Sequence, residues 1–298
     1  MKDVLVIGSD GKLGSGLFDK IKNRALGTSR RGSRSNSHPS VLHLDLLSHT
    51  SIQNLINVSA LKVAILVAAI SEPDECFINQ KLSQAINVDA PIEILKILKR
   101  RSIKPIFIST EMVFDGKKGF YSELDKPNPI LIYGKQKLEV EKYIQRNFTD
   151  YIIIRLSKIY SEVNNDNSIL NTFYSDITSN RVTRYATDQH FTPTLQHDFE
   201  LAVSSIIDKN VSGIFHLSSS FRINRWNFFE LFANRIGNFG KVQPCLLSDI
   251  KFLEKRPMDL SLNGEKLSQA TFINFATPEE GIDKWINTNK HRSINDKQ

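Results

Sequence analysis

The first two-thirds of the chain alternates short apolar runs with longer amphipathic stretches. The apolar runs predict strands at Val4–Ile7, Ala25–Thr28, Val41–His43, Val63–Ala69, Pro105–Ser109 and Tyr151–Leu156. The amphipathic stretches between them predict helices at Leu13–Lys22, Ser51–Asn57, Phe77–Arg100 and Lys135–Phe148. The run Val63–Ala69 is apolar at every position, which is typical of a strand covered on both faces. The alternation therefore predicts an α/β fold of Rossmann type, with a doubly wound parallel sheet.

After Tyr160 the pattern becomes less regular. Helices near Ile169–Ser179 and Gln196–Ile207 and a strand at Gly213–Leu217 precede a mostly helical remainder. The sequence contains no internal repeat and no Gly/Ser-rich linker. We therefore expect a dinucleotide-binding Rossmann domain over residues 1–156. A smaller, mostly helical substrate-binding lobe is expected over residues 157–298, interleaved with the last strands of the sheet.

Composition and charge narrow the class of protein. The chain has 298 residues, 40% hydrophobic and 24% charged, which are ordinary values for a globular protein. No apolar run reaches the roughly 18–20 residues of a membrane-spanning helix, and the N-terminus does not resemble a signal peptide, so a cytoplasmic protein is expected. Cys76 and Cys245 have no metal-ligand spacing, and no metal is expected.

The net charge of +7 raises the question of a nucleic-acid partner. The basic residues are scattered and no nucleic-acid-binding motif accompanies them, which argues against such a partner. A phosphate-bearing small molecule accounts for the excess charge equally well. The sequence leaves the oligomeric state open, with a homodimer as one possibility.

A glycine-rich turn follows the first predicted strand. Gly8, Gly11 and Gly14 recur at every third position before the first predicted helix. Such glycines allow a tight bend, close approach of a phosphate to the backbone, and close packing of the helix on its strand. The N-terminus of the helix then offers free N–H groups to a pyrophosphate. We interpret the turn as a dinucleotide site with contacts from Gly8, Asp10, Gly11, Lys12, Leu13 and Gly14.

The end of the second predicted strand bears on the choice of cofactor. It reads Thr28-Ser29-Arg30-Arg31, without the carboxylate that NAD-binding proteins use to accept from the ribose 2′-hydroxyl. A guanidinium can bind the extra 2′-phosphate of NADP through two parallel hydrogen bonds. Ser29, Arg30 and Arg31 therefore favour NADPH, with NADH as the second possibility. Asp45 and Leu46 are placed to contact the adenine, although Asp45 suits a cap of the following turn equally well.

A tyrosine and a lysine four residues apart are the candidate catalytic pair. Tyr133 and Lys137 lie about one helical turn apart, so their side chains share a face of the predicted helix. A nearby ammonium favours the phenolate and brings the pKa of a tyrosine toward neutral pH. Thr110 follows the strand Pro105–Ser109, at the edge of a parallel sheet where ligands bind. Its hydroxyl can donate a hydrogen bond to a substrate carbonyl.

Two segments resemble the extended short-chain dehydrogenase/reductases when taken together: Ile108–Gly116 and Tyr133–Glu141. The chain is most similar to their dTDP-4-dehydrorhamnose reductase branch, and the likeness covers nearly the whole sequence. The resemblance implies that Tyr133 is the proton donor, that Lys137 orients it and holds the nicotinamide ribose, and that Thr110 hydrogen-bonds the reacting carbonyl. It places Ala68 and Ala69 beside the cofactor. The implied reaction is hydride transfer from NADPH to a nucleotide-linked 4-keto-6-deoxysugar.

The resemblance also implies a substrate side, formed by Glu111, Met112, Lys158 and Arg256. Arg256 is expected to bind a diphosphate. The sequence departs from the branch at three positions: Met112 replaces a tyrosine, Lys158 an aromatic residue, and Ser161 a glycine. All three are expected on or near loops that face the sugar. The departures therefore indicate a different sugar or a different nucleotide.

Two other functions fit the same sequence. One is an epimerase, which keeps its cofactor bound, although Arg30 and Arg31 favour exchangeable NADPH. The other is a non-catalytic regulatory subunit that retains the cofactor site. Several polar and aromatic residues have simpler structural interpretations: Arg155 as part of an ion pair, His190, His197 and His216 as structural histidines, and Trp226, Phe228, Phe229 and Phe232 as core of the smaller lobe.

Overall fold

The fold is built on one seven-stranded parallel sheet, seen in a computed structural model that describes residues 2–31, 40–58, 60–163, 168–179, 181–219 and 221–289. The strand order is β11-β6-β5-β4-β1-β2-β3. The bounds are β1 Val4–Ile7, β2 Ala25–Ser29, β3 Val41–His43, β4 Val63–Leu66, β5 Lys104–Thr110, β6 Ile152–Leu156 and β11 Gly213–Leu217. The first six strands have the order of the doubly wound dinucleotide-binding fold, so the predicted fold class is confirmed.

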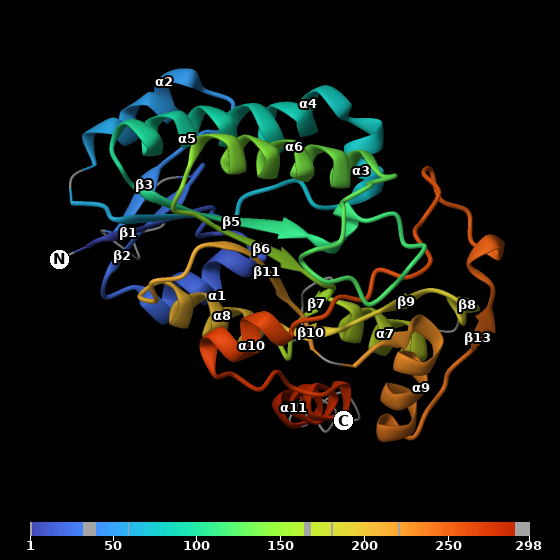
Figure 1. Ribbon diagram of the computed structural model, residues 1–298. Coiled ribbons are helices and arrows are strands. Elements are labelled where there is room, and N and C mark those ends of the chain that lie inside the picture. The colour runs from blue at the N-terminus through green and yellow to red at the C-terminus, as the bar shows by residue number, and fades with distance from the viewer. Residues whose placement is uncertain are drawn as a thin grey trace.

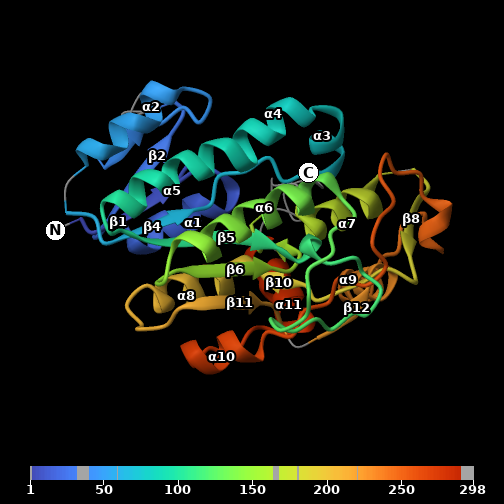
Figure 2. The ribbon, with the colours of Figure 1, turned by 45° about the horizontal axis from the view of Figure 1, so that its top comes forward.

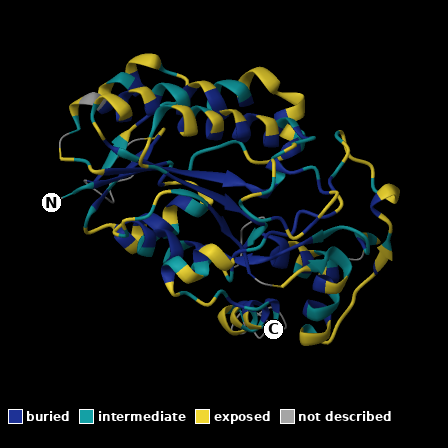
Figure 3. Cartoon of the chain, in the orientation of Figure 1, coloured by how far each residue is buried: buried dark blue, intermediate teal, exposed yellow. Residues whose placement is uncertain are grey.

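Helices cover both faces of this sheet (Figure 1). On one face lie α2 (His49–Gln53), α5 (Ala90–Arg100) and α6 (Ile132–Asn147); on the other lie α1 (Lys12–Ile21), α8 (Gln196–Ile206) and α10 (Glu265–Thr271). Each layer encloses its own apolar core against the strands. The central strands are buried, whereas the edge strand β3 is partly exposed and the helices expose their outer faces (Figure 3). This double cover explains why the strand sequences are continuous apolar runs.

Two predicted elements differ from those observed. The strand expected at Val63–Ala69 ends at Leu66, because both Val67 N and Ala68 N donate to the carbonyl oxygen of Ile7, where β1 itself ends. The helix expected at Phe77–Arg100 is divided into α3 (Pro73–Ile78), α4 (Gln80–Gln84), a π-helical turn (Ala85–Asp89) and α5. Pro91 has no N–H to continue the α-helical ladder, which favours this local rearrangement.

A smaller lobe lies beyond the carboxyl ends of β5 and β6 (Figures 1 and 2). It contains α7 (Ile169–Thr178), α9 (Arg225–Ile236) and α11 (Pro278–Asn289) with three short strand pairs: β7 (Ile159–Tyr160) with β10 (Thr194–Leu195), β8 (Thr183–Ala186) with β13 (Val242–Cys245), and β9 (His190–Phe191) with β12 (Ile223–Asn224). Its core is aromatic, and Trp226, Phe228, Phe229 and Phe232 pack there as predicted. Within the described ranges, no helix is both long and apolar enough to span a bilayer.

Candidate functional site

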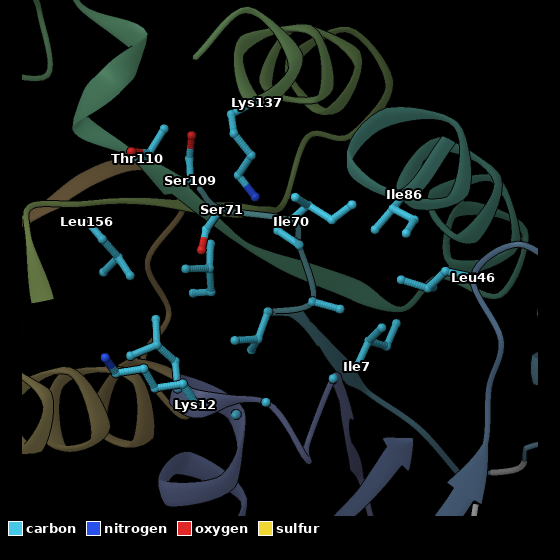
Figure 4. Close-up of a pocket in the computed structure, with 18 of the residues that line it drawn as sticks. Ile7, Lys12, Leu46, Ile70, Ser71, Ile86, Ser109, Thr110, Lys137 and Leu156 are labelled. Carbon is cyan, nitrogen blue, oxygen red and sulfur yellow. The ribbon is translucent and has the colours of Figure 1, made fainter. Parts of the chain in front are cut away.

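A cavity of about 690 Å³ opens at the carboxyl ends of the parallel strands. The loops after β1, β2, β4, β5 and β6 line it, together with the first turns of α6. In Figure 4, Lys137 extends from α6 into the cavity, Thr110 and Ser109 lie at the end of β5, and Lys12 lies on the opposite wall. Open parallel sheets bind their ligands at this edge, so the cavity is the candidate active site.

The glycine turn forms one end of the cavity with very little side chain. Gly8 has a φ of +90°, and a Cβ there would lie 2.7 Å from the Cβ of Ala68. A Cβ at Gly14 would lie 1.9 Å from the carbonyl oxygen of Gly8, so only glycine lets α1 begin this close to β1. Gly11 precedes the first residue of α1, whose N-terminal N–H groups have no intrahelical acceptor. This arrangement suits a pyrophosphate.

The end of β2 is tied to this turn. Ser29 Oγ donates to Asp10 Oδ2 at 2.6 Å, and Arg30 lines the cavity. Arg31 does not: it is exposed outside the lining, and only its backbone N–H reaches Ser29 Oγ, at 3.1 Å. Asp45 accepts from the N–H of Leu47 at 3.0 Å, as expected of a cap of this turn, and it also lines the cavity. All the other residues predicted to contact the cofactor line the cavity: Gly8, Asp10, Gly11, Lys12, Leu13, Gly14, Ser29, Arg30, Leu46, Ala68, Ala69, Tyr133 and Lys137.

Helix α6 brings Tyr133 and Lys137 to the cavity wall, and both side chains are buried. Burial raises the pKa of the Tyr133 phenol well above its usual value, and the negative charge of Glu111 adds to the rise. Burial lowers the pKa of Lys137 to about 7, although the charge of Glu141 acts in the opposite direction. The lysine Nζ lies 4.2 Å from the ring centre of Phe107. The phenol therefore keeps its proton at neutral pH, so the predicted lowering of the Tyr133 pKa by the lysine is wrong, because burial raises that pKa and also lets the ammonium lose its proton.

The end of β5 supplies a second hydroxyl. Thr110 Oγ1 donates to Glu111 Oε2 at 3.0 Å and accepts from the N–H of Met112 at 3.2 Å. The pKa of the Glu111 carboxyl is raised, because the effect of burial is the largest. Hydrogen bonds with the backbone and with Thr110, and the charges of Lys158 and Arg225, act in the opposite direction. Met112 and Lys158 line the same part of the cavity. Tyr133, Lys137, Thr110 and three of the four predicted substrate residues thus share one cavity.

A buried ion pair holds the same face of α6 that carries Tyr133 and Lys137. Glu141 accepts from Arg155 Nη2 at 2.7 Å and from Ser109 Oγ at 2.5 Å, which joins α6 to β6 and to the end of β5. Arg155 is therefore structural, as predicted. Glu141 was not among the predicted site residues. The signal was present, because positions 133, 137 and 141 follow one another at intervals of four along the same helix face.

A second buried network fixes the other side of α6 and was also not predicted. Asn87, in the π-helical turn, donates to Gln136 Oε1 at 2.9 Å and accepts from the N–H of Ile70 at 2.8 Å. Gln136 Nε2 in turn donates to Ser83 Oγ at 2.8 Å. Ile70 lines the cavity, so this network connects the catalytic helix to the loop after β4. No spacing in the sequence could pair these residues, which come from separate segments.

Arg256 and Ser161 lie outside the cavity lining, contrary to their predicted places beside the substrate. Arg256 Nη2 donates to Asp74 Oδ1 at 2.6 Å, and its guanidinium lies over the ring of Phe252 at 4.8 Å. The ion pair directs Arg256 toward α3 in the Rossmann layer. Ser161 is buried, and its hydroxyl accepts from the N–H of Val163. Of the three departures from the branch, Met112 and Lys158 therefore face the cavity.

Comparisons with known proteins agree with this geometry. The chain is 29% identical over 262 residues to the probable low-salt glycan biosynthesis reductase Agl14 of Haloferax volcanii, covering 85% of this chain and 86% of that protein. It is also 29% identical over 234 residues to methionine adenosyltransferase 2 subunit beta of Danio rerio, covering 75% of this chain and 70% of that protein. A solved dTDP-4-dehydrorhamnose reductase of Bacillus anthracis in complex with NADP has the same fold, with a TM-score of 0.85, 21% identity, and coverage of 96% of this chain and 99% of that one.

The family model described as the RmlD substrate binding domain matches residues 1–291, which is nearly the whole chain. The match includes both the glycine turn and the smaller lobe. The chain belongs to this family, the dTDP-4-dehydrorhamnose reductase-like branch of the extended short-chain dehydrogenase/reductases.

Proposed function

We propose that the protein is an NADPH-dependent reductase of sugar biosynthesis that acts on a nucleotide-linked 4-keto-6-deoxysugar. The observation that carries the proposal is the convergence of Tyr133, Lys137 and Thr110 in one cavity with the glycine turn. The relative Agl14, named as a probable glycan biosynthesis reductase, supports the same class of reaction.

The residues present suit a nicotinamide dinucleotide. A Cβ at Gly8 would meet Ala68, and one at Gly14 would meet the carbonyl oxygen of Gly8, so the turn is built of closely packed backbone, as in turns that bind a diphosphate. Arg30 lies at the far end of the lining, after β2, and supports a preference for the 2′-phosphate of NADPH over NADH. When bound, the cofactor supplies a hydride to the carbonyl carbon of the substrate.

Reduction of a ketone also requires a proton, and side chains of the protein can supply it. Tyr133 keeps its phenolic proton at neutral pH, because burial raises its pKa, and so can donate that proton to the carbonyl oxygen as the hydride arrives. Donation leaves a phenolate, which the Lys137 ammonium stabilises from the same helix face. Thr110 Oγ1 can turn from Glu111 to donate to the carbonyl oxygen, where charge develops. Hydride and proton together convert the ketone to an alcohol.

The experiment compares the wild-type protein with Tyr133→Phe, using NADPH and a panel of nucleotide 4-ketosugars. Loss of the phenolic proton donor should lower kcat by about 10²–10⁴-fold. The dissociation constant for NADPH should stay within about threefold, since the ring remains in place. NADH should support a lower kcat/KM than NADPH. Unchanged ketone reduction by Tyr133→Phe would remove Tyr133 from the mechanism and overturn the proposal.

A second candidate function is a non-catalytic regulatory subunit. The specific observation in its favour is the similarity to methionine adenosyltransferase 2 subunit beta over 75% of this chain. Tight NADPH binding without turnover of any ketosugar, together with co-purification of a separate enzyme whose rate changes on binding, would favour this function. Recovery of tightly held NAD⁺ from the purified protein would instead favour an epimerase.

A further inference from the structure

The sequence of β2 ends without a carboxylate, but the structure brings one to this place from the glycine turn. Asp10 is the third residue after β1, and its Oδ2 accepts a hydrogen bond from Ser29 Oγ at 2.6 Å. Ser29 is the last residue of β2, and both residues line the cavity. A carboxylate therefore lies at the end of β2, although it comes from 19 positions earlier in the chain.

The turn does not need this carboxylate in order to stay against β2. The N–H of Gly8 donates to Thr28 Oγ1 at 3.1 Å, and the N–H of Ser9 donates to the carbonyl oxygen of Thr28 at 3.0 Å. Ser9 Oγ donates to the same carbonyl oxygen at 3.1 Å. These hydrogen bonds fix the turn to the strand independently of Asp10, so a purely structural role does not explain an acid at this position.

One oxygen of the Asp10 carboxylate is available to a ligand. The N–H of Arg31 donates to Ser29 Oγ at 3.1 Å, so the hydroxyl proton of Ser29 is directed to Asp10 Oδ2. Among the described residues, no donor contacts Oδ1 and no cation pairs with the carboxylate. The side chain is exposed in the cavity lining. Asp10 therefore presents a free acceptor whose position is set by Ser29.

The other charged side chains of this half of the cavity leave the negative charge of Asp10 in place. Arg30 is exposed and lines the cavity, and it forms no ion pair with any residue that the structure describes. Asp45 adds a second negative charge, and one of its oxygens accepts from the N–H of Leu47. Lys12 is the first residue of α1, where a pyrophosphate is expected. The end of β2 thus offers a guanidinium and a carboxylate to the same part of a dinucleotide.

This part of a dinucleotide-binding fold recognises the adenosine ribose. An acid here accepts a hydrogen bond from the ribose 2′-hydroxyl, which is free in NADH and carries a phosphate in NADPH. A carboxylate repels a 2′-phosphate, because like charges a few ångströms apart disfavour binding. A guanidinium attracts the same phosphate. Asp10 and Arg30 therefore act in opposite directions on the choice between the two cofactors.

We propose that Asp10 is a specificity-determining residue that limits the preference of this protein for NADPH over NADH. Ser29 holds its carboxylate at the 2′-position of the ribose, where it accepts from the hydroxyl of NADH and opposes the phosphate of NADPH, while Arg30 favours the phosphate. The inference rests on the proposed function, since it concerns the cofactor of the same reaction. It also supplies, from the glycine turn, the acid that the end of β2 lacks in the sequence.

The test measures the dissociation constants of NADPH and NADH in the absence of a sugar, by titration of the cofactor fluorescence. The two cofactors differ only in the 2′-phosphate. Asp10→Asn removes the negative charge, is nearly isosteric, and keeps an oxygen that can accept from Ser29. Asp19→Asn removes the same charge from an exposed position of α1 outside the cavity lining, and it is the matched control.

We expect Asp10→Asn to raise the ratio of the NADH to the NADPH dissociation constant roughly tenfold, mainly through tighter binding of NADPH, because a neighbouring like charge is removed. Arg30→Met should lower this ratio, and Asp19→Asn should leave it unchanged. An unchanged ratio in Asp10→Asn, or an equal rise in Asp19→Asn, would overturn the role of Asp10 while the reductase proposal stands.

The reductase proposal can also fail by itself. If the ratio shifts as expected but the wild-type protein reduces no ketosugar with either cofactor, the role of Asp10 is supported and the proposed reaction is not. If the wild-type protein binds neither NADPH nor NADH, both proposals fail.

Discussion

The two ends of the cavity are built in opposite ways. At the cofactor end, Gly8, Gly11 and Gly14 present backbone, and the shape depends on the absence of side chains. At the substrate end, Glu111 and Lys158 present charged side chains that follow two different strands, β5 and β6. A backbone site tolerates little change, because the packing of a strand on a helix depends on it. A side-chain site can change its charge without changing the fold.

This difference explains where the chain departs from its family. Met112 and Lys158, which both replace aromatic residues of the branch, lie at the substrate end. The glycine turn, in contrast, keeps its spacing. Three substitutions test this division, one at the cofactor end, one at the junction of the two ends and one in the segment that supports α6.

Gly14→Ala should remove cofactor binding. The added methyl would lie 1.9 Å from the carbonyl oxygen of Gly8, which is backbone and cannot turn away. Overpacking of this kind lowers the free energy of unfolding by about 3 kcal/mol. We expect at least a hundredfold weaker NADPH binding, measured by quenching of protein fluorescence, and a lower Tm.

Gly11→Ala is the matched control for stability, since its methyl would meet the same oxygen at 3.4 Å, an ordinary contact. Its Tm should stay close to that of the wild-type protein, whatever its effect on NADPH. An equal fall in Tm for both variants would show that the turn is sensitive to any side chain, and the close approach at Gly14 would not explain its glycine.

Lys137 lies where the two ends of the cavity meet, and only 2% of this residue is exposed. Its pKa is lowered to about 7 in the folded protein from 10.5, so between these values the unfolded chain binds more protons than the folded one. The free energy of unfolding contributed by this residue therefore rises with pH across that window. Below pH 7 both states are protonated and the penalty for burying the ammonium is complete.

Lys137→Met should abolish reduction yet stabilise the protein against unfolding, most of all below pH 7, where the penalty for burying the ammonium is complete. The advantage over the wild-type protein should shrink by roughly 2 kcal/mol between pH 7 and pH 9. Urea unfolding at several pH values measures it, with Lys135→Met as the exposed-lysine control. A constant difference between Lys137→Met and the wild-type protein over this range would show that the ammonium is not penalised by burial.

The sequence predicted the cofactor end well because its determinants are local. The glycine spacing, the Tyr133–Lys137 interval and the order of apolar runs each lie within one segment, and the structure places all of them around the cavity. Arg31 is the exception: adjacent residues on a turn point in different directions, and only Arg30 lines the cavity. Periodicity could not give that orientation.

The substrate end was predicted less completely because its determinants are not local. Arg256 was assigned to the substrate, but Asp74, 182 positions away, forms an ion pair with it. That contact exists only once the lobe and the Rossmann layer have come together.

The smallest expected effect concerns a segment that joins the two ends. Glu254, in the loop before Arg256, accepts from the N–H of Ile132 at 2.9 Å and so holds the first turn of α6, one residue before Tyr133. An acidic group at a helix N-terminus satisfies a free N–H and stabilises the helix by about 1 kcal/mol. Glu254 is therefore a positioning residue, which acts on the chemistry through the helix that carries the phenol.

Glu254→Ala should lower kcat about tenfold with little change in KM, because the phenol loses its placement while the cavity keeps its lining. Glu254→Gln retains an oxygen acceptor and should recover most of that loss, which a purely electrostatic role of the carboxylate would not allow. Steady-state kinetics of the three proteins, with Tm as a check on folding, separates these cases. If NADPH affinity falls while kcat is unchanged, the loop that carries Glu254 acts on cofactor binding instead. The cofactor end and the substrate end would then not be separate at α6.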